Sequence, residues 1–103
     1  MANPMYGQNK DDSSLNYFSD VLSGSATWDP SGIGDGDEQA TNITVSGAEL
    51  GDFCLASISV DIQDMVLDAQ VTAEDTVTCV LHNGTGSEVD LAEFTVSVLV
   101  LQG

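Results

Sequence analysis

The amino-acid sequence predicts an all-β protein, an antiparallel β-sandwich with a separate N-terminal arm. Runs of β-branched and aromatic residues follow one another between turn residues, two of them alternate between apolar and polar residues, and no long segment has helical periodicity. The chain has 103 residues, which suits one small domain, and 42% of them are hydrophobic, which is enough for a packed core. We therefore expect one jelly-roll-like sandwich of about six short strands.

The chain is expected to divide into an N-terminal arm, residues 1–24, and a sandwich domain, residues 25–103. The first residues are mostly polar, which is typical of an extended tail. Between Ser13 and Leu22 the apolar residues recur at helical spacing ahead of Gly24, so this part of the arm is expected to form a short amphipathic helix. A helix of this length is marginal alone and needs a surface to lie on.

Strands are expected around Trp28 and in five further runs. These runs are Thr41 to Ser46, Phe53 to Asp61, Val66 to Ala73, Thr76 to Leu81 and Phe94 to Leu101. Alternation is clear in the third and fourth runs, so each is expected to bury one face. The expected buried faces are Leu67, Ala69, Val71 and Ala73 in the third run and Val77, Cys79 and Leu81 in the fourth. Phe53 and Phe94 are expected in the core.

The last run is apolar on both faces toward its end, which is typical of a strand in a sheet that is covered on both sides. No long helix is predicted that could cover it, so the cover is expected to be a second sheet or another subunit. The residues expected at an oligomer interface are Phe94, Val96, Val98, Leu99 and Leu101.

The charge balance excludes two classes of partner. Asp and Glu number 17, Lys10 is the one basic side chain, and the net charge is -16. Nucleic acids and anionic membranes are bound through Lys and Arg, so neither is expected as a partner. Concentrated salt would relieve the repulsion among the carboxylates, and abundant Asp with little Lys resembles proteins of halophilic archaea. The alternative is an ordinary acidic surface protein.

Few residues could support catalysis, and we expect no enzyme. His82 precedes the residues Asn83 to Gly86, whose composition predicts a hairpin turn. Cys79 lies three residues before His82 and so on the opposite strand face, while a pair of His82 with Cys54 stays open. Both cysteines are expected to be reduced and buried, with a bridge between neighbouring strands as the alternative. No signal segment or membrane span is recognisable, so synthesis in a cytoplasm is expected.

One glycine-rich loop carries a metal-like pattern. Asp35, Asp37 and Glu38 alternate like the start of a calcium loop, but the full twelve-residue spacing with its terminal Glu is missing. We expect no cofactor, only loosely bound cations such as calcium, sodium or potassium. The segments beginning at Asn42 and Asn83 match the glycosylation sequon, which has meaning only on a secretory route.

The order of several short motifs resembles small jelly-roll modules of tailed-virus particles. The motifs are Trp28-Asp29-Pro30, Gly47-Ala48-Glu49-Leu50-Gly51-Asp52, Asp75-Thr76-Val77-Thr78-Cys79-Val80, Asn83-Gly84-Thr85-Gly86 and Val89-Asp90-Leu91. Together they cover roughly residues 27–101. Modules of this kind are trimeric head-decoration or cement proteins, or tips of fibres and spikes. The chain departs from their pattern because its last strand lacks the Arg or Lys often found there, so salt bridges between subunits have no basis here.

This resemblance implies a capsid decoration protein of a tailed virus, made in the host cytoplasm and located on the virion surface, and the acidic composition points to a haloarchaeal host. It implies a homotrimer that binds the major capsid protein and stabilises the particle, with the N-terminal arm as the docking element. The residues expected to dock on the capsid are Met5, Tyr6, Lys10, Leu15, Tyr17, Phe18, Val21 and Leu22. A receptor-recognising fibre or spike tip, and a calcium- or carbohydrate-binding module, are the alternatives.

Overall fold

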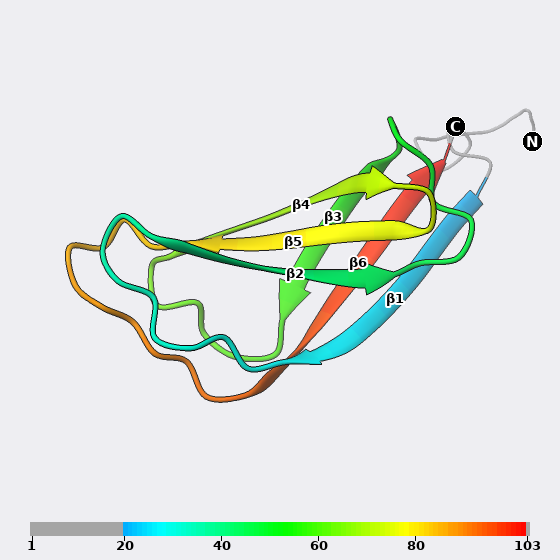
Figure 1. The fold of residues 1–103 in the computed structure, drawn as a ribbon. Coiled ribbons are helices and arrows are strands. Elements are labelled where there is room, and N and C mark those ends of the chain that lie inside the picture. Colours follow the sequence, from blue (N-terminus) through cyan, green and yellow to red (C-terminus); the bar gives the residue numbers. More distant parts are fainter. Residues whose placement is uncertain (1–19, 103) are drawn as a thin grey trace, which may run out of the picture.

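The computed structural model describes residues 20–102 and shows two packed β-sheets (Figure 1). The strands are β1 (Asp20–Trp28), β2 (Glu38–Thr44), β3 (Phe53–Ile58), β4 (Val66–Ala73), β5 (Thr76–His82) and β6 (Phe94–Gln102). One sheet has the order β1-β6-β3 and the other β2-β5-β4, and all pairs are antiparallel. The predicted all-β sandwich is confirmed, and residues 20–102 contain no helix, hence none that could span a membrane.

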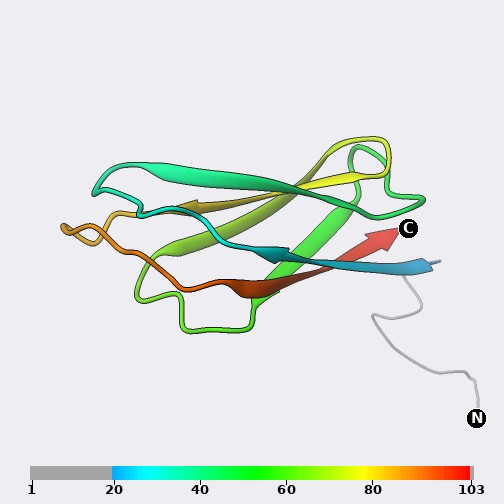
Figure 2. The same cartoon turned by 60° about the horizontal axis from the view of Figure 1, so that its bottom comes forward.

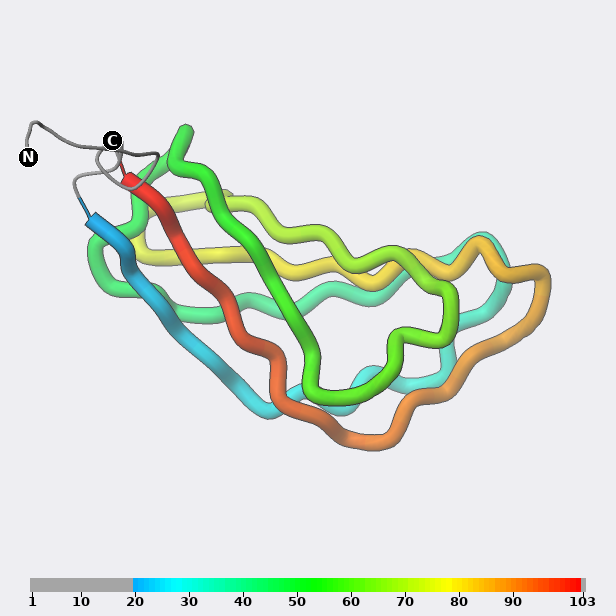
Figure 3. The backbone as a smooth tube through the Cα atoms, turned by 180° about the vertical axis from the view of Figure 1, so that it is seen from behind, coloured from blue at the N-terminus to red at the C-terminus, as the bar shows by residue number. Residues whose placement is uncertain are grey.

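The strands pair in a nested order that folds the chain over on itself. β6 is the central strand of one sheet and pairs with β1 and β3, and β5 is the central strand of the other and pairs with β2 and β4. The two layers are visible edge-on in Figure 2, and the view from behind in Figure 3 shows the β1-β6-β3 sheet crossing in front of the other. Only β4 and β5 form a tight hairpin; the other connections cross between the sheets or around their ends.

The core lies between the two sheets and follows strand alternation. On β6 the inward residues Phe94, Val96, Val98 and Val100 are buried, and on β5 Val77, Cys79 and Leu81 meet them from the opposite sheet. Trp28 closes one end of this core, with its ring packed edge-to-face on Phe94 at a centroid distance of 5.6 Å.

Two hydrogen-bonded side chains fasten the loops at the two ends. The Asp75 carboxylate accepts a bond from the Gly47 amide at 2.7 Å, and the Asp75 amide donates to the Ala48 carbonyl at 2.8 Å. This joins the β4–β5 turn to the loop before β3. At the other end Asn83 is fully buried, and its amide nitrogen donates to the carbonyls of Ile33 and Ser87, each at 2.7 Å.

Four sequence-based expectations differ from the fold: the helix of the arm, the domain boundary, the hairpin after His82 and the core position of Phe53. The helix expected between Ser13 and Leu22 is wrong at its end, because Val21 and Leu22 lie in β1 and pair with Leu101 and Val100 of β6. Strand pairing with β6 outweighs the local preference for a helix, because a helix of so few residues has little stability of its own. The remainder of that helix lies outside the described residues. The domain boundary at Gly24 falls inside β1, so the sandwich begins by Asp20.

The other two corrections concern the last half of the chain. Residues 83–93 do not form a hairpin, because they cross from β5 to β6 in the opposite sheet. Phe53 is not a core residue: its side chain is 62% exposed, since it occupies an outward position of β3 opposite Leu101. Phe94 is buried, as expected.

Candidate interaction surface

The outward side of the β1-β6-β3 sheet is a surface without charge, which we call the uncharged face. Its residues are Val21, Ser23, Ser25 and Thr27 of β1, Thr95, Ser97, Leu99 and Leu101 of β6, and Phe53, Leu55 and Ser57 of β3. None of them is ionisable, although the chain carries 17 acidic residues. The fold alone does not require charge to be excluded from one face, so this surface is the candidate functional site.

Register divides the uncharged face into two halves. The bulky half consists of two cross-strand rows, Val21–Leu101–Phe53 and Ser23–Leu99–Leu55. The small half continues the same three strands with the rows Ser25–Ser97–Ser57 and Thr27–Thr95. Large apolar side chains therefore project from one end of the face and short hydroxyl side chains cover the other.

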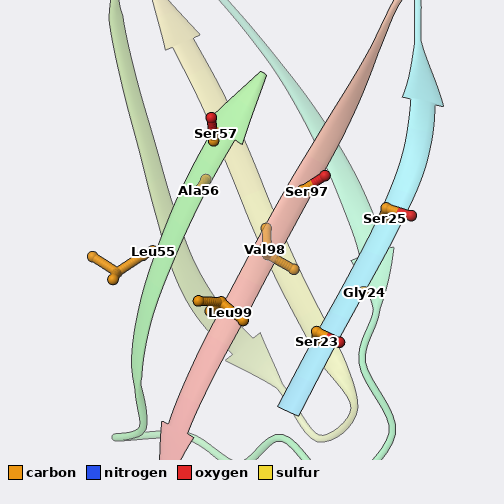
Figure 4. Close-up of a pocket in the computed structure, with 9 residues that line it drawn as sticks. All are labelled: Ser23, Gly24, Ser25, Leu55, Ala56, Ser57, Ser97, Val98 and Leu99. Carbon is orange, nitrogen blue, oxygen red and sulfur yellow. The ribbon is translucent and has the colours of Figure 1, made fainter. Parts of the chain in front are cut away.

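A hollow of about 460 Å³ lies where the two halves meet. Figure 4 shows Leu55 and Leu99 on one side of it and Ser25, Ser57 and Ser97 on the other. Its floor is the backbone of the three strands at Gly24, Ala56 and Val98. The hollow exists because small side chains stand next to leucines in the same sheet.

Acidic side chains surround the uncharged face at its ends instead of lying on it. Asp52 directly precedes β3 at the bulky end, where its carboxylate accepts hydrogen bonds from the Glu49 amide and the Gln102 side chain, each at 2.9 Å. Asp29 directly follows β1, and Glu93 directly precedes β6, at the opposite end. The face is thus a neutral strip between two acidic rims.

The outward side of the β2-β5-β4 sheet is polar by contrast. Thr78 in its centre donates a hydrogen bond to the Asn42 side-chain oxygen at 2.8 Å, and its hydroxyl is hydrogen-bonded to the Thr72 hydroxyl at 2.7 Å. Glu38 and His82 lie opposite one another at its end, with 3.8 Å between the carboxylate and ring nitrogen Nδ1. This sheet has an ordinary solvent-facing surface.

A second hollow of about 530 Å³ opens where the edges of β3 and β4 approach each other. Its lining includes Ile58, Val60, Ile62, Met65 and Val66. Most of these side chains already pack against the core, so the hollow is a shallow opening at the side of the sandwich.

The structure separates the residues expected at an oligomer interface. Phe94, Val96 and Val98 are at most 4% exposed, and their side chains belong to the protein's own core. Leu99 and Leu101 point outward on the uncharged face. Sequence reasoning missed Leu55 and Phe53 on the same face. Residues 21–28, 53–58 and 94–102 contain no acidic residue, but residues 39–48 and 76–87 also contain none, so this absence alone does not identify the face.

The residues expected to dock on a capsid fall into two groups. Val21 lies exposed on the uncharged face, and Leu22 points inward and packs against the core. The others lie outside the described residues: Met5, Tyr6, Lys10, Leu15, Tyr17 and Phe18.

The structure does not assemble the metal-like pattern into a cluster. Asp35, Asp37 and Glu38 are exposed, and the Asp35 carboxylate accepts a hydrogen bond from the Gly86 amide at 3.0 Å. Within residues 20–102, no group of three or more His, Cys, Asp or Glu side chains is placed to hold a metal ion.

The cysteines and the sequons have structural surroundings that define their chemistry. Cys79 is fully buried on β5, and burial, with a smaller contribution from nearby Cys54, raises the pKa of its thiol to about 11. Cys54 on β3 is partly buried, and burial also raises its pKa. Both are free thiols. Asn83 cannot accept a glycan, because its amide nitrogen is buried and donates two hydrogen bonds.

Comparison with protein-family models, with curated proteins and with solved structures gives no match for this chain.

Proposed function

We propose that the protein is a structural, non-enzymatic protein of a virus particle, a capsid decoration protein that associates with further copies of itself on the major capsid protein. The observation that carries this proposal is the uncharged face. Two molecules of net charge -16 repel one another, and only a surface from which charge is excluded lets them meet without bringing carboxylates together.

The order of motifs that resembles small jelly-roll modules supports the same function. The nested pairing of β1 with β6 and of β2 with β5 is compatible with a jelly-roll-like path of the chain. The resemblance implies a trimer, whereas the two unlike halves of the uncharged face favour a two-fold pair. The N-terminal arm is the docking element of the proposal, with its apolar side chains as anchors and Lys10 as the one cation.

A receptor-binding tip is the less favoured candidate. Such a tip would present aromatic side chains on its loops. Within residues 20–102 the aromatic residues are Trp28, Phe53 and Phe94, and all three lie in strands.

The particle itself provides the test. Quantitative mass spectrometry of purified virus particles should find hundreds of copies of this protein per particle. A handful of copies would favour a fibre or spike tip, and none would remove the proposal.

The docking role of the arm is tested by deletion. Because β1 begins at Asp20, removal of residues 1–19 should leave the sandwich folded, whereas removal of residues 1–24 also deletes paired residues of β1 and should lower the melting temperature. The 1–19 deletion should no longer bind particles. Lys10→Ala should weaken binding little, because an exposed ion pair contributes about 0–1 kcal/mol. Unchanged coating by the 1–19 deletion would place docking on the sandwich.

The proposed salt-rich habitat predicts a direction for stability. Screening lowers the repulsion among carboxylates more in the compact folded state than in the expanded chain. The melting temperature, measured by circular dichroism, should therefore rise as sodium chloride is added up to molar concentrations. A flat or falling curve would contradict the adaptation to salt.

A further inference from the structure

We propose that the uncharged face binds the same face of a second copy, in a two-fold pair that places the bulky half of each copy on the small half of the other. This inference deepens the proposed function and rests on the self-association in it, but it does not depend on the virus particle. The occupant of the face is thus a second molecule of this chain.

The first argument is the distribution of size on the face. Val21, Leu55 and Leu99 project from one half, while Ser25, Ser57 and Ser97 leave the other half low, with the hollow of about 460 Å³ between them. Consider a two-fold axis that lies in the plane of the interface, perpendicular to the strands, between the Leu99 row and the Ser97 row. Rotation about this axis turns the second copy so that its strands run opposite to those of the first. It superposes the projecting half of one copy on the low half of the other.

A two-fold interface must be self-complementary, because the same patch supplies both sides. The uncharged face meets this condition through its two unlike halves (Figure 4). A face that was bulky throughout would leave gaps at its ends when paired, and one that was small throughout would offer little apolar surface. Two β-sheets packed face to face interdigitate in this way at about 10 Å separation.

The second argument is charge. A partner of unknown identity could carry any charge, but a second copy carries -16, so most approaches of two copies place carboxylates against carboxylates. Pairing through the uncharged face keeps Asp29, Asp52 and Glu93 at the rims, where solvent and salt screen them. The pair should therefore become tighter as salt concentration rises.

The area of the face sets the expected strength. Three strands are roughly 14 Å wide, and about seven residues of each are roughly 23 Å long, so the face offers on the order of 300–400 Å² per copy. A standard interface buries about 800 Å² per partner. The pair is consequently a weak, concentration-dependent dimer in solution, and it would be reinforced where many copies are held on one surface.

The experiment is sedimentation velocity of the full chain over a wide concentration range in about 2 M sodium chloride, a concentration at which charges are screened beyond a few ångströms. The wild-type protein should show a monomer–dimer equilibrium. Leu55→Asp places a carboxylate on the uncharged face and should raise the dimer dissociation constant by about tenfold or more. Val66→Asp is the matched control, because Val66 is 60% exposed on β4 of the other sheet and Leu55 is 61% exposed on β3. It adds the same charge and should change the constant by less than about threefold.

A third variant separates shape from general stickiness. Ser97→Leu makes the low half bulky, so it should weaken a pair in which leucines of the partner occupy this half. If the face associated only through non-specific hydrophobic contact, the added leucine would tighten association instead. Circular dichroism should show all three variants folded, since each changes an exposed side chain.

Several outcomes would overturn the inference. They are a monomer at every concentration, a trimer, an equal loss of pairing in Val66→Asp, and tighter pairing in Ser97→Leu. The particle test is independent of these outcomes. If the protein forms the stated dimer but does not associate with particles, the proposed function is wrong and the inference of the pair stands. If it associates with particles but does not form the dimer, the inference of the pair is wrong and the association with the particle stands.

Discussion

The two sheets of this sandwich bury similar apolar side chains on their inner faces, but their outer faces differ in charge. The inward residues of β6 and of β5 are both largely valine and leucine, with little exposure. Outward, the β2-β5-β4 sheet carries Glu38, Asp68, His82 and a hydrogen-bonded Asn42–Thr78 pair, whereas the β1-β6-β3 sheet carries no ionisable side chain. The fold requires the inward pattern, and it does not require the outward difference.

That difference makes the outer face of the β1-β6-β3 sheet the candidate interaction surface. Most acidic residues lie in the loops, and the strands of the β2-β5-β4 sheet contain two, Glu38 and Asp68, whereas the outward positions of the β1-β6-β3 sheet contain none. An apolar, uncharged strip on an acidic surface marks an interaction site. The following substitutions test whether inward residues serve stability and outward residues of the uncharged face serve association.

The largest expected effect contrasts two leucines. Leu81 on β5 is fully buried, so Leu81→Ala removes core contacts and leaves a cavity, which should lower the free energy of unfolding by about 2–5 kcal/mol. Leu55→Ala changes an exposed residue and should stay within about 0.5 kcal/mol of wild type. Urea denaturation measures both. A comparable loss in the two variants would mean that Leu55 is covered within the monomer and that the uncharged face is part of its core.

The second effect is the pH dependence of the free energy of unfolding, which should differ for the inward cysteines of the two sheets. The folded state holds the Cys79 thiol protonated up to a pKa of about 11, against 9.0 as the ordinary value. The resulting stabilisation is complete below pH 9 and is lost as pH rises from 9 through 11, by about 2–3 kcal/mol in total. Cys79→Ala should remove this decline of the free energy of unfolding with pH.

Cys54→Ala is the matched variant for that measurement, since Cys54 faces the same core from β3 but is only partly buried. It should remove less of the decline. The same difference should make Cys54 react faster than Cys79 with an alkylating reagent in the native protein. Equal rates for both thiols would show that the β5 side of the core opens as readily as the β3 side.

The third effect concerns the close contact between the two sheets where β1 lies against β2. A methyl group added at Gly24 would lie 2.9 Å from Val45 Cγ2 and 3.0 Å from the Thr44 carbonyl oxygen. Gly24→Ala should therefore cost about 1–3 kcal/mol through overpacking. Ser25→Ala, one residue later and pointing outward, should be nearly neutral in thermal unfolding of the dilute monomer. A neutral Gly24→Ala would mean that β1 is free to move away from β2.

The sequence predicted those parts of the fold in which local pattern and tertiary burial agree. The runs Val66 to Ala73 and Thr76 to Leu81 alternate between apolar and polar residues over most of their length, and both lie in strands. Their expected inward residues are buried or pack against the core, except Ala73, which follows the register irregularity after Val71 and is exposed. In β1 the local pattern suggested a helix instead, because Leu22 and its neighbours acquire strand partners only from β6, nearly 80 residues later in the chain.

The interaction surface was harder to predict for a related reason. In β3 the outward residues Phe53 and Leu55 are larger and more apolar than the inward Cys54 and Ala56. Hydrophobicity alone therefore assigns this strand to the wrong face. The buried Asn83 was also beyond prediction, since the carbonyl of Ile33 that accepts its hydrogen bond comes from a loop 50 residues earlier.

The smallest expected effect compares the central outward residue of each sheet. Thr78 on β5 is hydrogen-bonded to Asn42 and Thr72, so Thr78→Val should lower the free energy of unfolding by about 0.5–1.5 kcal/mol. Ser97 on β6 has the corresponding central place in the other sheet, and Ser97→Val adds a β-branched residue that favours strands. It should leave unfolding of the dilute monomer within about 0.5 kcal/mol of wild type and yet weaken pairing, because it raises the low half of the uncharged face. Denaturation at low protein concentration and sedimentation at high concentration, applied to both variants, measure the two quantities separately. If Thr78→Val also weakened pairing as much as Ser97→Val, association would involve both sheets, and the functional contrast between their outer faces would be lost.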